Sequence, residues 1–257
     1  KEAGIPDGVA NLVNGDSAKI GEAMLESPKL KKISFTGSTR VGKILMDGAS
    51  KTNTKLALEL GGNAPVIIMD DVDVEQVAKT AVTSKFRNAG QVCVAPQRFF
   101  VQRKIYEAFV TAAAHYAKAH VTGNGLETDS RMGPLINRRQ QEMVMSLIEE
   151  ANQEGAEIVT GGTKREKGFF IEPTVIADRK GTARFADNEI FGPVLPVVPF
   201  DTLDEVIEKA NNTPYGLAAY IWTNDLKTSI LLSEKLEFGM VGINEWAPHA
   251  TEAPFGG

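Results

Sequence analysis

Short apolar stretches alternate with amphipathic stretches along most of the chain, and the two kinds differ in their period. The apolar stretches are rich in Val, Ile, Leu and Phe and are bounded by glycine, proline or polar residues, which is typical of β-strands. The amphipathic stretches repeat apolar or small residues at the spacing of one helix face. Residues 74–89 are an example, and Asp73, directly before them, is a suitable helix N-cap.

Because strands and helices alternate, the chain is expected to adopt an α/β fold. The expected strands are residues 31–35, 55–60, 64–69, 99–102, 156–162, 173–176, 193–200, 218–223 and 240–244. The expected helices are residues 40–50, 74–89, 105–121, 138–155, 201–212 and 226–239, and Gly155 is the stop signal of the helix that it ends.

Composition and charge exclude several classes of protein. The chain has 257 residues, enough for one large domain or two small ones, and it is 42% hydrophobic with a net charge of -5. It has no run rich in Lys and Arg, so no nucleic-acid surface is expected. Its apolar runs are far shorter than the roughly 20 residues of a membrane helix, so no membrane segment is expected. One cysteine fits a reducing compartment, and a cytoplasmic location is predicted.

The two ends suggest a piece of a longer protein. The chain starts at Lys1 without a methionine and stops at the glycines of APFGG, which predict a turn into further chain. Activity of this chain alone is therefore not assumed.

The stretch FTGSTRVGKI, residues 35–44, has the glycines and lysine of a phosphate loop. Such a loop places a hydroxyl on magnesium directly after its lysine, but Ile44 occupies that position. A strand, a glycine turn and a helix start still offer unpaired N–H groups to an anion, and Ser38 and Thr39 add hydroxyls. The stretch suits a dinucleotide diphosphate better than a triphosphate, and a plain helix cap with Gly37 in a tight turn is the alternative.

Two further residues have both a chemical and a purely structural interpretation. Cys93 lies in FRNAGQVCVAPQR, where it is either a small buried apolar side chain or a thiolate nucleophile. Glu59 ends an apolar strand, where it is either a buried general base or a surface residue of an edge strand. One cysteine and the scattered histidines His115, His120 and His249 do not suggest a zinc site.

The order of the motifs is more specific than any one of them. The chain contains, in sequence, FTGSTRVG, LELGGNAP, FRNAGQVCVAP, EIFGPVLPV, PYGLAAYIWTND and APFGG. Over essentially its whole length it resembles the aldehyde dehydrogenase superfamily, and within it the succinate-semialdehyde dehydrogenases. The resemblance implies the second half of a Rossmann-type cofactor domain at residues 1–58. It also implies an α/β catalytic domain, incomplete at its C-terminal end, at residues 59–257.

The resemblance also implies roles for individual residues, with NAD or NADP as the cofactor. Cys93 would attack a small aldehyde, and Glu59 would activate the water that hydrolyses the resulting thioester. Glu189 would bind the nicotinamide ribose, with Phe191 beside the nicotinamide. The cofactor-binding residues implied are Gly37, Ser38, Thr39, Arg40, Val41, Gly42, Leu60, Glu189 and Phe191. The full-length protein would be a homo-oligomer, either a dimer or a tetramer.

The substrate prediction depends on Arg87. Succinate-semialdehyde dehydrogenases have an arginine at the matching position of KFRNAGQVC that binds the substrate carboxylate, and a small acidic semialdehyde is therefore predicted. A surface arginine or a helix C-cap is the alternative. Ala95 occupies the position where those enzymes often have a second cysteine, which argues against a redox switch. The rival functions are a non-catalytic protein of the same fold and a triphosphate-binding protein.

Overall fold

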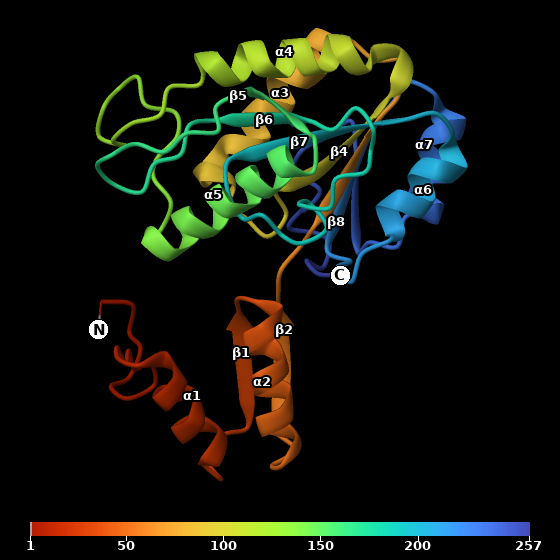
Figure 1. Cartoon of the computed structure of the whole chain (residues 1–257). Coiled ribbons are helices and arrows are strands. Elements are labelled where there is room, and N and C mark those ends of the chain that lie inside the picture. The colour runs from red at the N-terminus through yellow and green to blue at the C-terminus, as the bar shows by residue number, and fades with distance from the viewer. Residues whose placement is uncertain (1) are drawn as a thin grey trace. The chain divides into compact units, whose positions relative to one another are not determined.

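The computed structural model describes residues 2–257, which form two compact units joined between Leu60 and Gly61 (Figure 1). The predicted division was between residues 58 and 59, and Lys1 lies outside the described residues. The assignment of the units to a cofactor domain and a catalytic domain stays a prediction.

The first unit is built around a β-α-β segment. Helix α1 (Ser17–Glu26) precedes strand β1 (Lys32–Thr36), helix α2 (Thr39–Ser50) and strand β2 (Lys55–Glu59). The two strands are parallel, with Lys32 paired to Lys55 and Thr36 to Glu59, and α2 is the crossover that parallel pairing requires. Helix α1 packs against α2 through Leu25, which lies next to Gly48.

The second unit contains a seven-stranded sheet. Its strand order is β5-β6-β7-β4-β3-β8-β9, and all neighbouring pairs are parallel except β5 with β6. The strands are β3 (Ala64–Ile68), β4 (Pro96–Gln102), β5 (Glu157–Thr160), β6 (Thr174–Ala177), β7 (Val194–Phe200), β8 (Ala218–Trp222) and β9 (Met240–Ile243). The helices are α3 (Val74–Phe86), α4 (Tyr106–Ala119), α5 (Arg138–Gln153), α6 (Leu203–Asn211) and α7 (Leu226–Lys235), with short 3-10 turns η1 (Arg87–Gly90) and η2 (Arg103–Ile105).

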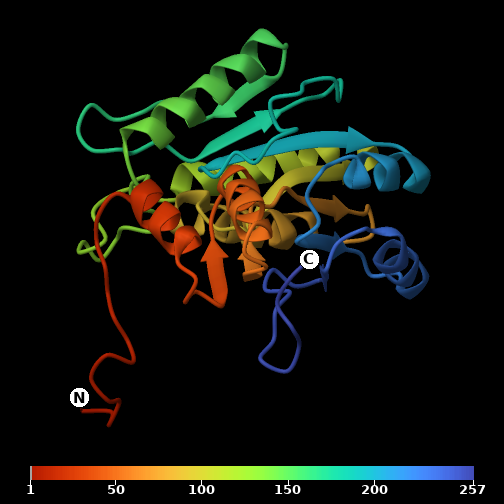
Figure 2. The same ribbon diagram turned by 90° about the horizontal axis from the view of Figure 1, so that it is seen from below.

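Helices cover both faces of this sheet. Alternate residues of β4 point to opposite faces, so Phe99 and Val101 join a core with α3, α4 and α5, while Phe100 joins a core with α6 and α7. Seen from below, α5 (green) runs by β5 and β6, and α6 and α7 (blue) lie at the opposite side (Figure 2). The predicted α/β fold is confirmed, and the near-continuous apolar strands reflect burial on both faces.

In the part of the chain that the structure describes, no helix combines the length and apolarity needed to span a bilayer.

Polar side chains cap the starts of most helices in residues 2–257. Asp73 caps α3 by accepting a hydrogen bond from the N–H of Gln76, as predicted. Gly155 follows α5 with φ +89, a conformation in which glycine has no steric penalty, and it ends the helix as predicted. The prediction of helix through Ala89 was wrong, because α3 ends at Phe86 and the chain then turns left-handed. Helix α1, capped by Asp16, was not predicted at all.

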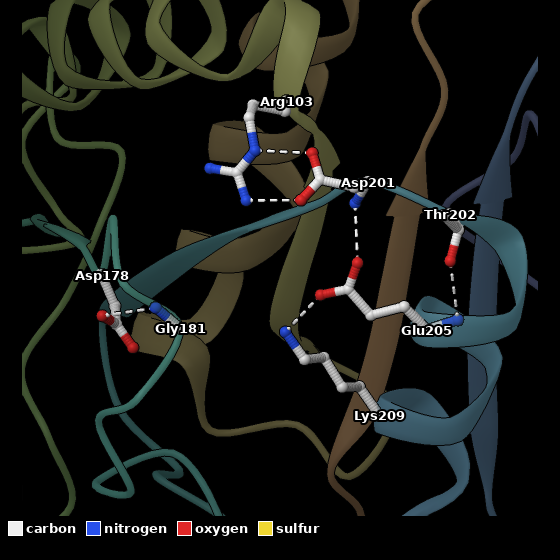
Figure 3. A network of polar contacts seen from close by, with 7 residues as sticks. All are labelled: Arg103, Asp178, Gly181, Asp201, Thr202, Glu205 and Lys209. Atoms are coloured by element: carbon white, nitrogen blue, oxygen red, sulfur yellow. Dashed lines mark hydrogen bonds and ion pairs between the residues drawn. The ribbon is translucent and has the colours of Figure 1, made fainter.

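Helix α6 is fixed at its start by a group of charged side chains (Figure 3). Arg103 binds both carboxylate oxygens of Asp201 at 2.6 and 2.7 Å. The main-chain N–H of Asp201 donates to Glu205, which also accepts from Lys209, each at 2.8 Å. Thr202 caps the helix by accepting from the N–H of Glu205 at 3.2 Å. These groups are mostly exposed, so they contribute more to the direction of α6 than to stability.

The other end of α6 is tied to the start of β3 by Arg98, a buried arginine on β4. Its guanidinium donates to the carbonyls of Lys209 and Ala210 at 2.9 and 2.8 Å, which are unsatisfied groups of a helix end. Its Nε donates to the carbonyl of Asn63 at 3.1 Å. Burial lowers the pKa of Arg98 to about 10, so it stays charged at neutral pH. Arg98 therefore fixes the chain that enters β3, where the candidate site begins.

Candidate active site

The motifs of the second unit meet at one edge of its sheet. Gly61 and Gly62 lead into β3, Cys93 leads into β4, and Glu189 with Phe191 leads into β7. Strands β7, β4 and β3 are adjacent and parallel, so the loops that enter them lie at the same edge. This is the amino edge, whereas ligands of open α/β sheets usually bind at the carboxyl edge. A search guided by that general rule would have looked at the wrong end of the strands.

Glycines occur where these loops cross. A Cβ added to Gly62 would overlap the carbonyl oxygen of Cys93, and one added to Gly90 would overlap the carbonyl oxygen of Gly192. A glycine allows another group to approach the backbone closely. For Gly62, the approaching group is the main chain of Cys93 itself.

Cys93 is presented by two successive turns. After α3, residues Asn88, Ala89 and Gly90 have φ values of 52, 54 and 73, which is a left-handed turn that costs about 1–2 kcal/mol for each non-glycine residue. A second turn follows, closed by the N–H of Ala95 donating to the carbonyl of Val92 at 2.9 Å, with Cys93 inside it. The cysteine is half-buried and packs against the larger core of the second unit, and its role as nucleophile stays a prediction.

Several contacts fix the loop that carries Cys93. Asn88 and Gln91 exchange side-chain to main-chain hydrogen bonds, each at 3.1 Å. The amide oxygen of Gln91 accepts from the N–H of Ile136 at 3.0 Å. The hydroxyl of Tyr220, on β8, donates to the carbonyl of Val94. Backbone strain of this kind persists only where surrounding contacts hold it, and it is frequent at functional sites.

Glu189 is bound to the glycine turn that precedes β3. Its Oε1 accepts a hydrogen bond from the N–H of Gly62 at 3.0 Å, and a Cβ on Gly61 would lie 2.6 Å from its Oε2. Burial raises the pKa of Glu189, while the N–H of Gly62 and the charge of Lys85 act in the opposite direction. Because Oε1 is bound to Gly62, Oε2 is the oxygen of Glu189 that can accept hydrogen bonds from a ligand hydroxyl.

Phe191 follows Glu189 in a left-handed conformation, with φ 48. The side-chain amide of Gln140, in the first turn of α5, donates to its carbonyl at 2.9 Å. Helix α5 therefore fixes the turn of EIFGP, a contact that the sequence did not reveal.

Arg87 lies close to Cys93 without capping α3 through its side chain. The main-chain N–H of Arg87 donates to the carbonyl of Thr83, and its side chain is exposed. Burial raises the pKa of Tyr220; the charges of Cys93 and Glu245 act in the same direction, whereas Arg87 lowers it. The hydroxyl of Tyr220, which donates to Val94, is therefore within electrostatic range of both Arg87 and Cys93. The main chain of Arg87 agrees with the C-cap alternative and its exposed guanidinium with the surface-arginine alternative, so its role in substrate binding stays a prediction.

In the first unit, the turn between β1 and α2 combines the predicted phosphate-binding residues. The N–H of Gly37 donates to the carbonyl of Glu59 at 2.9 Å. The hydroxyl of Ser38 accepts from the N–H of Val41 at 3.4 Å, so Ser38 acts as a helix cap. Leu60 packs on Gly42, where an added Cβ would lie 2.7 Å from the leucine side chain. Between these residues, Thr39, Arg40 and Val41 form the first turn of α2.

Glu59 is the last residue of β2, and its side chain is half-buried. Strand β2 pairs only with β1 within this two-stranded sheet, so Glu59 lies at the end of an edge strand of the first unit. The role of Glu59 as a base stays a prediction.

Among residues 2–257, no three His, Cys, Asp or Glu side chains gather as a metal site would require. His115 lies on α4 and His120 is the residue that ends it, so the two do not share one helix face.

Two residues of the site were missed by the sequence analysis. Asn63 is buried and donates from its side-chain amide to the carbonyls of Ala186 and Asp187, both at 3.0 Å, which links the entry of β3 to the segment before Glu189. Lys85, on α3, is completely buried. Neither had a signal in the sequence, because both depend on contacts between distant segments.

Comparison with known proteins agrees with the resemblance seen in the motifs. Residues 1–257 match the sequence model of the Aldehyde dehydrogenase family. The chain is 46% identical to a mitochondrial succinate-semialdehyde dehydrogenase of Oryza sativa subsp. japonica over 257 residues, which are 100% of this chain and 49% of that protein. The chain thus spans about half the length of the curated relatives that it matches.

Solved structures give the same result. An NADP-dependent enzyme of E. coli superposes with a TM-score of 0.96 at 40% identity, covering 100% of this chain and 53% of that one. The NAD+ complex of an aldehyde dehydrogenase from Bacillus cereus superposes with a TM-score of 0.94 at 42% identity, covering 99% and 52%.

Proposed function

Because the chain belongs to the aldehyde dehydrogenase family, we propose that the protein of which it is a part oxidises an aldehyde to a carboxylate with NAD or NADP. The observation that carries the proposal is the position of Cys93. It is half-buried on a strained turn, and its main chain is packed against the same glycine pair that binds the carboxylate of Glu189.

The chemistry proposed for Cys93 explains why a thiol is needed. Its thiolate adds to the carbonyl carbon, which gives a thiohemiacetal with a negative oxygen. When that oxygen re-forms a carbonyl, hydride leaves the carbon and a thioester remains on Cys93. A bound NAD or NADP supplies the hydride acceptor. Water then attacks the thioester, and Glu59 takes one proton of that water, so that the C–S bond breaks, the carboxylic acid is released and the thiolate of Cys93 is restored.

Two parts of the chain fit a dinucleotide. The amino end of α2, with the turn from Gly37 to Gly42, offers N–H groups to a diphosphate without requiring a metal ion. Glu189 has an oxygen available for ribose hydroxyls, and Phe191 lies next to it in the chain. Relatives are described as acting with NADP or as bound to NAD+, which supports either cofactor.

Replacement of Glu59 by glutamine in the full-length protein tests this mechanism. Glutamine keeps the shape but cannot accept the proton of the water, so acylation should proceed while thioester hydrolysis slows by about 10²–10⁴-fold. Stopped-flow absorbance should therefore show a burst of NAD(P)H of about one equivalent per site, followed by a slow steady state. Equal losses in the burst and in the steady state would mean that Glu59 does not act in hydrolysis.

We further propose that the substrate is a small acidic semialdehyde such as succinate semialdehyde, with its carboxylate bound by Arg87. Relatives include succinate-semialdehyde dehydrogenases at 46% and 45% identity. The exposed guanidinium near Tyr220 and Cys93 also has the fork geometry that pairs with a carboxylate.

For Arg87→Ala, a selective loss is expected. A charge-assisted hydrogen bond contributes about 1.5–3 kcal/mol, so kcat/KM for succinate semialdehyde should fall roughly ten- to hundredfold. An uncharged aldehyde of similar length should be affected little. Steady-state kinetics with both substrates decide the question, and Arg139→Ala, which changes an exposed arginine of α5, is the control. If both substrates lose the same factor, Arg87 supports the thiol loop and does not select acidic aldehydes.

The cytoplasmic location and the homo-oligomeric state of the full-length protein remain predictions. They do not affect the chemistry proposed for Cys93 and Glu59.

A further inference from the structure

Lys85 is a buried charge that the proposed chemistry does not use. It lies in the last turn of α3 with none of its surface exposed, and no other lysine of residues 2–257 is buried. Lysine is almost never fully buried unless it is paired, because removing an ammonium from water is costly. A completely buried lysine beside the candidate site therefore needs a stabilising partner.

The contact that Lys85 makes closes the base of the loop that carries Cys93. Its Nζ donates to the side-chain oxygen of Gln97 at 2.8 Å. Lys85 precedes the left-handed turn and Gln97 follows the Cys93 turn, so the bond joins the two ends of this loop. Gln97 lies at a bulge in β4, since Ala64 pairs with Pro96 but Pro65 pairs with Arg98. Gln97 alternates with Arg98 along β4, so it lies on the α3 side with Phe99, while Arg98 lies on the other face with Phe100 and binds α6.

The charge of Lys85 acts on Glu189. Their attraction lowers the pKa of Glu189 against the effect of burial, and it raises the pKa of Lys85, which burial nevertheless lowers to about 7. Glu189 is the charged group that affects Lys85, since Gln97 on β4 is neutral and Arg98 is directed to the other face. Glu189 itself also accepts from the N–H of Gly62 and lies near Tyr215.

We propose that Lys85 is a positioning residue: its buried ammonium joins the two ends of the Cys93 loop through Gln97 and places a positive charge behind the carboxylate that Gly62 binds. The inference rests on the proposed function insofar as Glu189 binds the cofactor. Lys85 thus couples the thiol loop to the cofactor carboxylate without touching either ligand. An apolar residue of similar length would fill the space without providing the bond or the charge.

Removal of the Lys85 ammonium should shift the pH dependence of NAD(P) affinity in one direction only. Without the ammonium, the pKa of Glu189 rises further, so Glu189 becomes protonated at a higher pH and loses its capacity to accept from ribose hydroxyls. Affinity for NAD(P) plotted against pH has an acid limb where Glu189 takes up its proton. Lys85→Met should move this limb upward by about one pH unit, the smaller end of the effect of a nearby opposite charge.

The experiment uses the full-length protein with Lys85→Met, the double variant Lys85→Met/Gln97→Leu, and Lys79→Met. The double variant removes the buried charge together with the amide that would be left unpaired, so it provides a folded protein where the single variant does not. Lys79 is an exposed lysine of the same helix and is the matched control. Calorimetry gives the affinity for NAD(P) as a function of pH, and hydrogen exchange of residues 87–96 reports the loop.

The expected result is an upward shift of the acid limb and severalfold faster exchange of the loop in both Lys85 variants, with neither change in Lys79→Met. An unmoved acid limb in a folded Lys85 variant that still binds NAD(P) overturns the inference and leaves the proposed function intact. If the unaltered protein binds neither cofactor, the proposed function falls. The inference is then decided by exchange of residues 87–96, and an unchanged rate overturns it.

Discussion

Cys93→Ser in the full-length protein is expected to lower kcat for aldehyde oxidation by on the order of 10³-fold or more. A serine hydroxyl is far harder to deprotonate than a thiol, so the tetrahedral adduct that releases hydride cannot form at a useful rate. Serine nevertheless fits the same turn, and Glu189 and the turn at Gly37 are untouched. The affinity for NAD(P), measured by calorimetry, should therefore stay within about twofold of that of the unaltered protein.

Two outcomes would contradict this expectation in different ways. If the serine variant kept most of its rate, Cys93 would not be the nucleophile. If the rate and the cofactor affinity both collapsed, the substitution would have disturbed the loop, and kinetics alone would not identify the nucleophile. Ser84→Ala, which changes an α3 residue just before the loop, is a suitable control for changes near the end of that helix.

Much of the fold was predictable because each buried strand and each capped helix has a local signal. Strands β3, β7 and β8 are buried along nearly their whole length, so their apolar runs stand out in the sequence. Helix α1 was missed although Asp16 signals its start and Ile20 and Met24 lie one helical turn apart; none of its residues is buried. The end of α3 was misplaced because Asn88 and Ala89 take a left-handed conformation that alanine rarely adopts.

The candidate site was predictable in its residue types and not in its arrangement. The family resemblance carried by the ordered motifs implied Cys93, Glu59 and Glu189, since each lies within one of those motifs. Gly62 packs on Cys93 and Gly90 packs on Gly192, and each contact joins segments far apart in the chain. The spacing of apolar residues along the sequence does not predict such contacts. In the sequence, Lys85 is one lysine of an amphipathic helix, and only the fold shows that it is buried.

The glycine pair before β3 should give two different results when each member is changed to alanine. On Gly62, the new methyl group would overlap the main-chain carbonyl of Cys93, and neither side chain nor solvent can relieve the overlap. The Cys93 turn must move, and a displacement of about 1 Å can reduce the rate by about 10²-fold. We therefore expect Gly62→Ala to lower kcat by about 10²-fold, with a smaller change in the KM for NAD(P).

On Gly61, the new methyl group would lie 2.6 Å from Oε2 of Glu189, which is the far end of a flexible side chain. The carboxylate can rotate away, so Cys93 stays in place and the cofactor loses a contact. Gly61→Ala should therefore raise the KM for NAD(P) severalfold and leave kcat nearly unchanged. Gly133→Ala is the control, because a Cβ there meets no atom within 4 Å. Equal effects of Gly61→Ala and Gly62→Ala on kcat would show that the two glycines do not separate thiol placement from cofactor binding.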